Sequence, residues 1–335
     1  MSATPPLMTS SGSLGQMLGP IQKEIDHFER RLDEMLQADV DMVHEVARYM
    51  AALKGKRLRP ALTVLCTRAT GRWDDRVIDA GVGVEMIHAA TVIHDDVVDG
   101  AGTRRGQATV NSKWNDHVAV LMGDFLLARA LCLLVSLGDL QVMAAVSGAT
   151  ERLSKGEIFE FQIGLQADTS EASYFAMVSD KTASLISAAC RIGPLLAGAP
   201  AEVVESLTKY GESLGLAFQI ADDILDFTGD ESTLGKPVGR DLRERKITLP
   251  LIKSLAVARE AERAEIVRVL SAPEPQEEDW NRVFDFVDRR GGVAAASAAA
   301  RACADRAQAC LEVLEPSVER TILETTVRLV VERDS

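Results

Sequence analysis

One long apolar segment that ends in three acidic residues constrains the fold of this chain more than any other feature. Apolar residues run from Val77 to Ile93 with almost no polar face, and the segment closes with Asp95, Asp96 and Asp99. A helix that is apolar on nearly all sides belongs inside a protein. Its C-terminal end already carries about half a negative charge from the helix dipole. Asp95 and Asp99 are four residues apart and share one helix face. Three acids at the negative end of a buried helix need an outside cation to be stable.

A second segment bears on whether these acids bind a cation or are simply solvated where the helix surfaces. The pattern of residues 94–99 recurs at residues 221–226, again at the end of an apolar segment and before a glycine-containing loop. Coincidental repetition of so specific a pattern is improbable, which favours cation binding. If the two ends face each other, they present six carboxylates, which are Asp95, Asp96, Asp99, Asp222, Asp223 and Asp226.

The residue types at these two ends indicate the kind of ligand. Oxygen ligands alone suit a hard ion, most naturally Mg²⁺, which commonly bridges carboxylates to substrate phosphates. Each basic residue nearby is, taken singly, more often a solvated surface charge, but their joint placement favours a diphosphate site. No Walker-type glycine loop is present, so a nucleotide is not indicated. The basic residues are Lys56, Arg59, Arg104, Arg105, Lys181, Lys236 and Lys246.

The rest of the chain favours helices. Its 335 residues are 47% hydrophobic and only 4% aromatic, and Ala, Leu, Val, Glu and Arg dominate. Strand-like alternation is absent. Residues 1–13, rich in Ser, Thr, Pro and Met, are expected to form a flexible leader. We predict an all-α fold in which residues 14–335 form one domain of roughly a dozen helices. Helix breaks are expected at residues 54–60, 71–75, 100–107, 228–245, 273–275 and 291–292.

Composition and charge exclude several classes of function. The net charge of −13 disfavours a nucleic-acid partner, although a basic pocket or a metal can still attract an anionic substrate. The five cysteines form no C-x-x-C pair, which favours reduced thiols over zinc binding. The first 22 residues lack Lys and Arg, unlike a targeting segment, and no uncharged apolar run reaches the ~20 residues of a membrane span. We expect a cytoplasmic protein.

Several stretches give the chain a resemblance to the trans-type polyprenyl diphosphate synthases over nearly its whole length. They are GKRLRP, HAATVIHDDVVD, RRG, GDFLLARA, KTASL, FQIADDILDF, LGKPVGRDL and KITLPL. The resemblance implies an all-α bundle around a deep central cavity, usually as a homodimer, with the two aspartate-rich ends facing each other at the mouth. The chain departs from the family pattern at two positions, where Lys54 and Arg245 stand in place of the usual glycines.

The resemblance also implies a role for each candidate residue. The principal ligands of about three Mg²⁺ ions would be Asp95, Asp99 and Asp222, supported by Asp96, Asp223 and Asp226. Isopentenyl diphosphate would be held by Lys56, Arg59, His88 and Arg105. The allylic diphosphate would be held by Arg104, Lys181 and Lys236, and Lys246 matches the lysine of the family's last basic stretch. Thr182 and Gln219 would direct oxygens toward the allylic cation, which forms by ionisation and is attacked by the isopentenyl double bond.

Small residues one turn below Asp95 bear on product length. If the allylic tail descends along this helix, each upstream turn is about 5.4 Å deeper, and Ala90 and Thr91 leave room there. Leu131 stands where some medium-to-long-chain relatives have Phe, which also favours a longer product. We therefore expect a product of roughly eight to ten isoprene units, with ten favoured, for quinone side chains.

Three other functions stay open at this point. A shorter-chain (geranylgeranyl or farnesyl) synthase would share every motif. A terpene cyclase usually has Asn, Ser and Glu in its second metal motif, whereas this chain repeats D-D-x-x-D. A non-catalytic regulatory subunit typically loses carboxylates from one motif, and none is missing here. The expected partners are the two diphosphate substrates and a second subunit, with peripheral membrane contact during product release.

Overall fold

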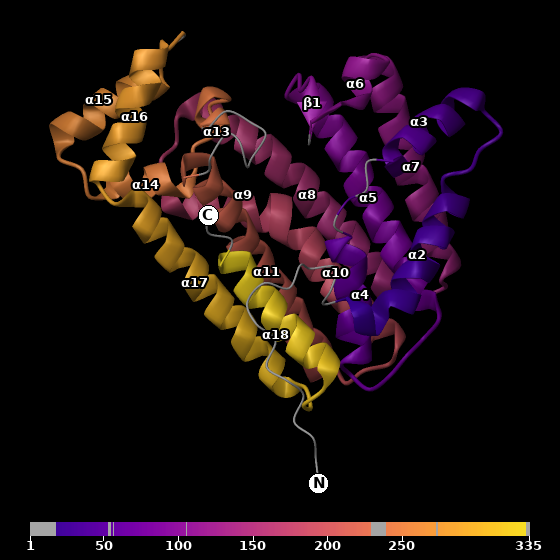
Figure 1. The fold of residues 1–335 in the computed structure, drawn as a ribbon. Coiled ribbons are helices and arrows are strands. Elements are labelled where there is room, and N and C mark those ends of the chain that lie inside the picture. The colour runs from indigo at the N-terminus through magenta and orange to yellow at the C-terminus, as the bar shows by residue number, and fades with distance from the viewer. Residues whose placement is uncertain are drawn as a thin grey trace.

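The structure is a computed structural model that describes residues 18–52, 55, 57–104, 106–228, 239–272 and 274–332. Within these residues nearly all regular structure is helical, so the prediction of an all-α fold is confirmed (Figure 1). The expected leader, residues 1–13, lies outside the described residues, as do Lys56, Arg105 and Lys236. The division into a leader and one domain therefore stays a prediction.

The first half of the chain forms several helices, one of which is apolar along most of its length. They are η1 (Gly19–Ile21), α2 (Gln22–Met35), α3 (Asp41–Ala52), α4 (Leu58–Arg68), α5 (Arg76–Val98), α6 (Val110–Lys113) and α7 (Asp116–Ser136). As its sequence requires, α5 is buried along most of its length, and it contacts α7 most extensively, with α2, α4 and α10 on its other sides. Burial of this segment on all sides fixes α5 as the centre of this half.

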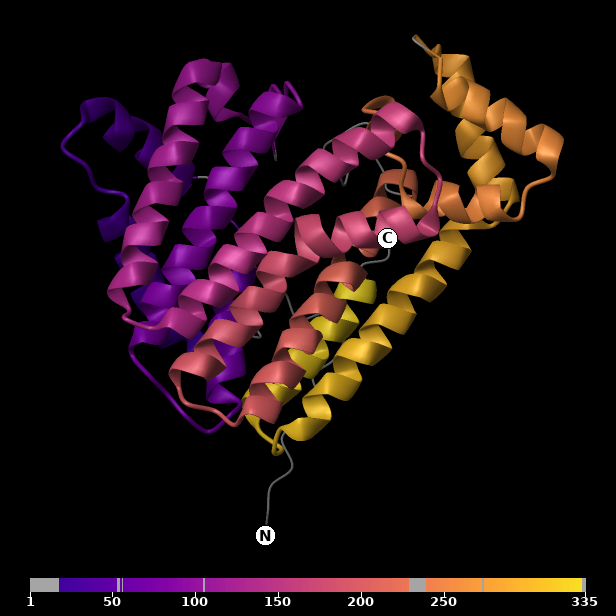
Figure 2. The same ribbon diagram turned by 180° about the vertical axis from the view of Figure 1, so that it is seen from behind.

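The second half adds further helices, long and short, beside the first. They are α8 (Leu140–Gln166), α9 (Glu171–Val178), the π-helical turn η2 (Ser179–Ala183), α10 (Ser184–Leu196), α11 (Ala201–Thr228), α13 (Arg240–Arg243), α14 (Leu249–Ala256), α15 (Glu260–Leu270), α16 (Glu277–Arg289), α17 (Gly292–Cys310), η3 (Leu311–Val313) and α18 (Val318–Val331). Helix α11 packs between α10 and α17. The pair α15 and α16 projects from one end of the bundle (Figures 1 and 2).

A short hairpin after α5 was not predicted from the sequence. Its strands β1 (Thr103–Arg104) and β2 (Gln107–Ala108) pair antiparallel, with Thr103 opposite Ala108. Strands of two residues are too short to show the alternation that identifies a strand in a sequence. The Tyr49 hydroxyl on α3 donates a hydrogen bond of 2.6 Å to the Ala108 carbonyl, which ties the hairpin to the bundle.

Two described helices, α5 and α7, are long and apolar enough to cross a membrane by length and composition alone. Both lie in the bundle, where 67% of the most apolar window of α5 and 39% of that of α7 are buried. The side chains that α7 leaves exposed include a row of apolar residues, the α7 stripe, made of Val120, Leu121, Leu131 and Val135. All five cysteines are free thiols, in agreement with the sequence prediction.

Candidate functional site

The C-terminal ends of α5 and α11 meet at one pocket of about 230 Å³. The hairpin, the turn η2 and the segment 240–248 complete its wall. Helix α5 brings its acids here because its apolar body is buried and only its last turn reaches the opening. The predicted site residues that line the pocket are Asp95, Asp96, Asp99, Arg104, Lys181, Thr182, Gln219, Asp222, Asp223 and Lys246.

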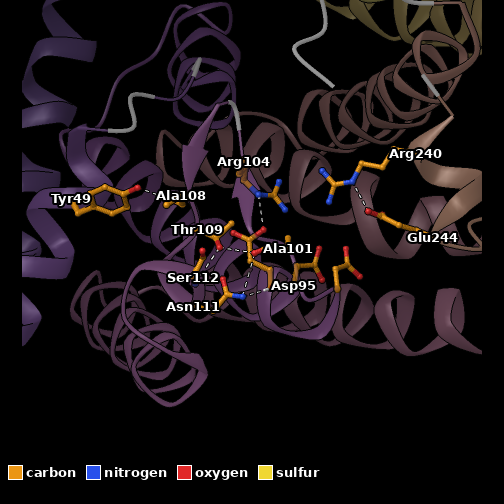
Figure 3. Close-up of polar contacts among 12 residues, drawn as sticks. Tyr49, Asp95, Ala101, Arg104, Ala108, Thr109, Asn111, Ser112, Arg240 and Glu244 are labelled. Atoms are coloured by element: carbon orange, nitrogen blue, oxygen red, sulfur yellow. Dashed lines mark hydrogen bonds and ion pairs between the residues drawn. The ribbon is translucent and has the colours of Figure 1, made fainter. Parts of the chain in front are cut away.

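Arg104 neutralises Asp96 from the hairpin. Its Nε donates a hydrogen bond of 2.8 Å to Asp96 Oδ1, and its guanidinium extends from β1 toward the acids (Figure 3). The Thr109 hydroxyl donates to the Ala101 carbonyl at 2.6 Å, and the Asn111 amide donates to the Asp96 carbonyl at 3.2 Å, which fixes the base of the hairpin. Burial raises the pKa of Asp96, and Arg104 opposes that shift. The hairpin thus holds one cation over the end of α5.

The other two acids of α5 are paired with lysines from the opposite wall. Lys246 Nζ donates to Asp99 Oδ2 at 3.0 Å and to Glu244 Oε2 at 3.1 Å. Lys181 Nζ lies 3.8 Å from Asp95 Oδ2. Every aspartate of the first acidic end therefore has a basic side chain from a different element beside it.

Lys181 is shared with two further acids on α8. Its Nζ lies 2.7 Å from Glu157 Oε2 and 2.6 Å from Glu160 Oε2. Burial alone would lower the pKa of Lys181, but Glu160, Asp95 and Glu157 together raise it. Burial, opposed by Lys181 and aided by Asp95, raises the pKa of Glu157 to about 8. More negative than positive groups surround this lysine, so one of the acids retains its proton readily.

The second acidic end has a different construction. Asp223 is only 2% exposed, and it accepts hydrogen bonds from the Tyr174 hydroxyl at 2.5 Å and the Gln219 amide at 2.9 Å. Burial raises the pKa of Asp223 well above its usual value, although both hydrogen bonds oppose the shift. Gln219 Oε1 in turn accepts from the Thr182 hydroxyl at 2.8 Å. A continuous hydrogen-bonded chain therefore links the turn η2 to Asp223.

Asp226 holds the start of α13 instead of facing the pocket. Its two carboxylate oxygens accept hydrogen bonds of 3.2 Å from the backbone N–H groups of Arg240 and Asp241. This cap places Asp241 on the pocket wall, where burial raises the pKa of Asp241 to about 7. Asp222 is exposed to the pocket, and no hydrogen bond or ion pair joins it to another described residue. Of the three aspartates, Asp222 alone is left open to a ligand.

The donor set suits a hard cation. Within the described part of the chain, no three acidic, histidine or cysteine side chains already converge on one point. Instead, basic side chains neutralise the acids of α5 at distances of 2.8–3.8 Å. The pocket offers carboxylate oxygens and no thiol or imidazole among the residues that line it, which is the donor chemistry of Mg²⁺ or Ca²⁺.

Arg59 and His88 lie outside the residues that line this pocket. The Nε of Arg59 on α4 is buried, with no hydrogen-bond partner among the described residues, and burial lowers the pKa of Arg59. Its neighbour Arg57 adopts a left-handed backbone (φ 49°) and pairs with Glu29 at 2.8 Å and Glu85 at 3.1 Å. His88 follows Glu85 by three residues, on the same side of α5. Arg57 thus pairs with Glu85, the acid whose charge also acts on Arg59.

The three residues predicted to set product length occupy different environments. Ala90 is buried in α5, with 1% of its surface exposed. The Thr91 hydroxyl, half-buried, donates to the His88 carbonyl at 2.9 Å. Leu131 is 39% exposed, in the α7 stripe. Ala90 therefore belongs to the packed interior, whereas Leu131 faces outward in the single chain.

Sequence reasoning missed several residues of the site. Glu157 and Glu160 are three apart on one face of α8, which is too common a pattern to single out. Tyr174 gives no signal, because a tyrosine in an apolar helix normally indicates core packing. Asp241 does lie within the stretch LGKPVGRDL that carried the resemblance, so its position next to the second acidic end could have identified it.

Comparison with known proteins decides the family. Residues 40–287 match the sequence profile of the polyprenyl synthetases. The chain belongs to this family. The resemblance derived from the motifs is thereby confirmed, and the synthase has an activity of the prenyltransferase class. The two aspartate-rich stretches were among the motifs on which that resemblance depended.

Relatives of this synthase match it along nearly its whole length. The all-trans-nonaprenyl-diphosphate synthase (geranyl-diphosphate specific) of Rhodobacter capsulatus is 35% identical over 95% of this chain and 97% of its own. The crystal structure of a decaprenyl diphosphate synthase from Rhodobacter capsulatus has a TM-score of 0.91 at 34% identity, covering 96% of this chain and 99% of the other. A polyprenyl synthase from Caulobacter crescentus, complexed with calcium and isoprenyl diphosphate, has a TM-score of 0.90 at 34% identity, covering 98% and 100%.

Proposed function

We propose that this protein is a long-chain trans-polyprenyl diphosphate synthase that adds isopentenyl diphosphate repeatedly to an allylic diphosphate. The observation that carries the proposal is the meeting of two aspartate-rich helix ends at one pocket whose wall also holds Arg104, Lys181 and Lys246. The long-chain products named for its relatives, such as nonaprenyl and decaprenyl diphosphate, support a long-chain product.

The acids of the pocket would hold the metal. Asp95, Asp99 and Asp222 would be the principal ligands of about three Mg²⁺ ions, with Asp96, Asp223 and Asp226 in support. Bound Mg²⁺ supplies positive charge that stabilises the departing diphosphate. The calcium and isoprenyl diphosphate in the Caulobacter structure support an oxygen-ligand site for a divalent ion and a diphosphate.

The basic side chains would receive the diphosphate oxygens. Lys181 and Lys246, now paired with acids of the pocket, would turn to the phosphate when the metal replaces them as counter-charges for Asp95 and Asp99. Arg104 and Lys236 would complete the allylic diphosphate site. Neutralising the leaving group in this way favours ionisation of the allylic C–O bond.

Thr182 and Gln219 would stabilise the organic part of the transition state. Their hydrogen bond to each other and the bond from Gln219 to Asp223 fix both side chains on the pocket wall. Oxygens held in place cost no reorganisation when positive charge develops on the allylic carbons. The isopentenyl double bond then attacks that cation, and loss of a proton restores an allylic diphosphate.

Isopentenyl diphosphate would bind beside this pocket, through Lys56, Arg59, His88 and Arg105. Arg59 supports this assignment because its buried Nε lacks a hydrogen-bond partner in the described part of the chain. A buried N–H donor without a partner is costly, and an anionic ligand would satisfy the Arg59 Nε. The pairing of Arg57 with Glu29 and Glu85 leaves those acids engaged elsewhere.

We further propose a product of roughly eight to ten isoprene units, with ten favoured, for use as a quinone side chain. Ala90 and Thr91 are small residues one turn below Asp95, and although Ala90 is packed in the single chain, both would obstruct a growing tail less than bulky side chains. Leu131 would line the path of the tail only if a second subunit covered the α7 stripe. Geranylgeranyl diphosphate synthases are also among the relatives, so a shorter product is the alternative.

We also propose that the synthase works as a homodimer in the cytoplasm, with peripheral membrane contact when the product leaves. The α7 stripe supports a second subunit, because a row of exposed apolar side chains on one helix marks an interaction surface. A second copy would cover Val120, Leu121, Leu131 and Val135 together.

Chain elongation with radiolabelled isopentenyl diphosphate tests the proposal. The purified protein, Mg²⁺ and farnesyl or geranylgeranyl diphosphate should give a linear prenyl diphosphate of roughly 40 to 50 carbons. A product that stops at about 15 or 20 carbons would make this a shorter-chain synthase. A cyclic hydrocarbon would indicate a cyclase, and no product without a partner chain would indicate a regulatory subunit.

A further inference from the structure

The π-helical turn η2 carries the two residues of this site that most need an accurate position. It interrupts what would otherwise be one helix from α9 to α10, and the Ser184 N–H bonds to the Ser179 carbonyl five residues back. An inserted turn of this kind is rare and is frequently found at functional sites. Lys181 and Thr182 lie within it and face the pocket. Whatever stabilises this turn therefore determines where both side chains point.

Two glycines hold the backbone of the turn between α8 and α11. A Cβ at Gly156 on α8 would lie 2.4 Å from the Lys181 nitrogen, and a Cβ at Gly215 on α11 would lie 2.6 Å from Ala183 Cα. Neither position accepts a side chain unless the backbone moves. These contacts limit how far the turn can shift toward either helix, but they do not fix its rotation.

Arg152 on α8, one turn before Gly156, makes the directional contacts. Its Nε donates to Asp180 Oδ1 at 2.8 Å, and its Nη2 donates to the Ser179 carbonyl at 2.9 Å and hydroxyl oxygen at 2.7 Å. The same guanidinium donates to both carboxylate oxygens of Glu212 on α11, at 2.8 and 3.2 Å. The Ser179 hydroxyl also donates to Glu212 at 2.5 Å. One arginine thus joins α8, the turn and α11.

The charges of this cluster balance. Lys155 Nζ lies 3.0 Å from Asp180 Oδ2, so two basic groups face the two acids Asp180 and Glu212. Although burial would lower it, the pKa of Arg152 is raised by Glu212 and Asp180. Neither Arg152 nor Glu212 is among the residues that line the pocket. Both contact the turn directly through Ser179, and the turn carries Lys181 and Thr182 into the pocket.

We propose that Arg152, held by Glu212, is a positioning residue that sets the direction of Lys181 and Thr182 in the pocket. The inference rests on the proposed function and extends it to side chains that touch no substrate. A guanidinium group can fix the rotation of a turn because its N–H donors point in fixed directions. Its loss would displace the Lys181 ammonium and the Thr182 hydroxyl, and displacements of about 1 Å cost up to about 100-fold in rate.

Steady-state kinetics of Arg152→Ala test this positioning role. We expect a KM for the allylic diphosphate about tenfold higher and a lower kcat, with the KM for isopentenyl diphosphate within about twofold. A general loss of folded protein would lower kcat and change neither KM. Arg152→Lys, which keeps the charge and loses the fork, should restore only part of the activity and remains informative if Arg152→Ala does not fold.

Arg191→Ala is the matched control. Arg191 is similarly half-exposed and joins α10 to α11 through Thr208 at 3.3 Å and Glu205 at 3.6 Å, without touching the turn. It should leave both KM values unchanged. Equal effects of Arg152→Ala and Arg191→Ala, or an unchanged allylic KM in Arg152→Ala, would overturn the inference.

A binding measurement separates this inference from the proposed function. Calorimetry with inorganic diphosphate and Mg²⁺ should show a Kd about tenfold higher for Arg152→Ala and unchanged for Arg191→Ala. A wild-type protein that fails to elongate contradicts the proposed function whatever the calorimetry gives. A wild type that elongates, with an Arg152→Ala variant that binds magnesium diphosphate normally, contradicts only the positioning role.

Discussion

The two acidic helix ends share one sequence pattern but differ in construction. At the end of α5, all three aspartates lie beside basic side chains from other elements, Arg104, Lys181 and Lys246. At the end of α11, Asp223 and Asp226 are tied down by neutral hydrogen-bond donors. Only Asp222 is exposed there. The first end is neutralised by charges that can exchange partners, and the second is a scaffold that presents one carboxylate.

The largest expected effect comes from removing one principal metal-binding carboxylate from either acidic end. Asp95→Ala and Asp222→Ala should each lower kcat by at least about 1,000-fold, because each removes a charge that stabilises the bound metal and diphosphate. Elongation assays with saturating substrates measure this. The exposed Asp305→Ala on α17 is the control and should retain wild-type activity. A loss of less than about tenfold for either variant would remove that residue from the metal site.

A smaller effect is expected where the scaffold loses one hydrogen bond. Tyr174→Phe leaves the buried Asp223 carboxylate with one donor fewer, so the free energy of unfolding should fall by about 1–3 kcal/mol and kcat by about tenfold. Denaturant unfolding and elongation assays measure the two changes.

Tyr210→Phe is the matched control for Tyr174→Phe. Tyr210 is also fully buried, and its hydroxyl donates to the Leu323 carbonyl at 3.1 Å, away from the pocket. It should lose stability and keep its kcat. Equal kcat values for the two variants would show that Asp223 does not depend on Tyr174.

The crowding of acids around Lys181 predicts a pH dependence for the metal-free protein. The folded pKa of Glu157 is about 8, above its usual 4.5, so the folded state binds the proton more tightly than the unfolded state. Its contribution to stability is complete below pH 4.5 and is lost as the pH rises through about 8. Between these values the stability of the wild type should fall, relative to Glu157→Gln, by up to about 1.4 kcal/mol per pH unit.

Thermal or denaturant unfolding of both proteins in a chelating buffer measures this difference. Parallel stability curves for wild type and Glu157→Gln would show that Glu157 ionises normally and that the first acidic end carries no excess of negative charge.

The smallest effect on turnover is expected from substitutions in the bodies of α5 and α7. These substitutions should change the length of the product. Ala90→Phe places an aromatic ring one turn below Asp95 and should shorten the product while preserving incorporation of isopentenyl diphosphate. Leu131→Phe should shorten it less, because Leu131 faces outward in the single chain. Chromatographic sizing of the products measures both, with Leu121→Phe in the same stripe as the control. Unchanged products would show that these side chains do not line the path of the tail.

The sequence was sufficient to predict the helices and both acidic ends. Apolar segments located α5 and α11, and the repeated aspartate spacing, together with the family resemblance, predicted that their ends meet, because these signals are local in the chain. The individual roles of Asp223 and Asp226 could not be read in the same way. Their partners, Tyr174 and the α13 backbone, come from distant segments, so the difference between the two ends arises only on folding.

The turn η2 shows the same limit. The sequence around Lys181 and Thr182 contains none of the predicted helix breaks, because nothing in its composition marks an inserted residue. The interruption is stabilised by Arg152, Gly156 and Gly215, which come from other helices. Tertiary contacts of this kind override local helix propensity.

The central claim is that the two acidic ends act together on one diphosphate through bound metal. Calorimetric titration of inorganic diphosphate with Mg²⁺ into wild type, Asp95→Ala, Asp222→Ala and the double variant tests it directly. Each single variant should raise Kd about 100-fold, and the double variant should bind no more than about threefold more weakly than either, because losing one end already breaks the bridge. Losses that multiply to about 10,000-fold in the double variant would show that the two ends bind independently, and would contradict the account.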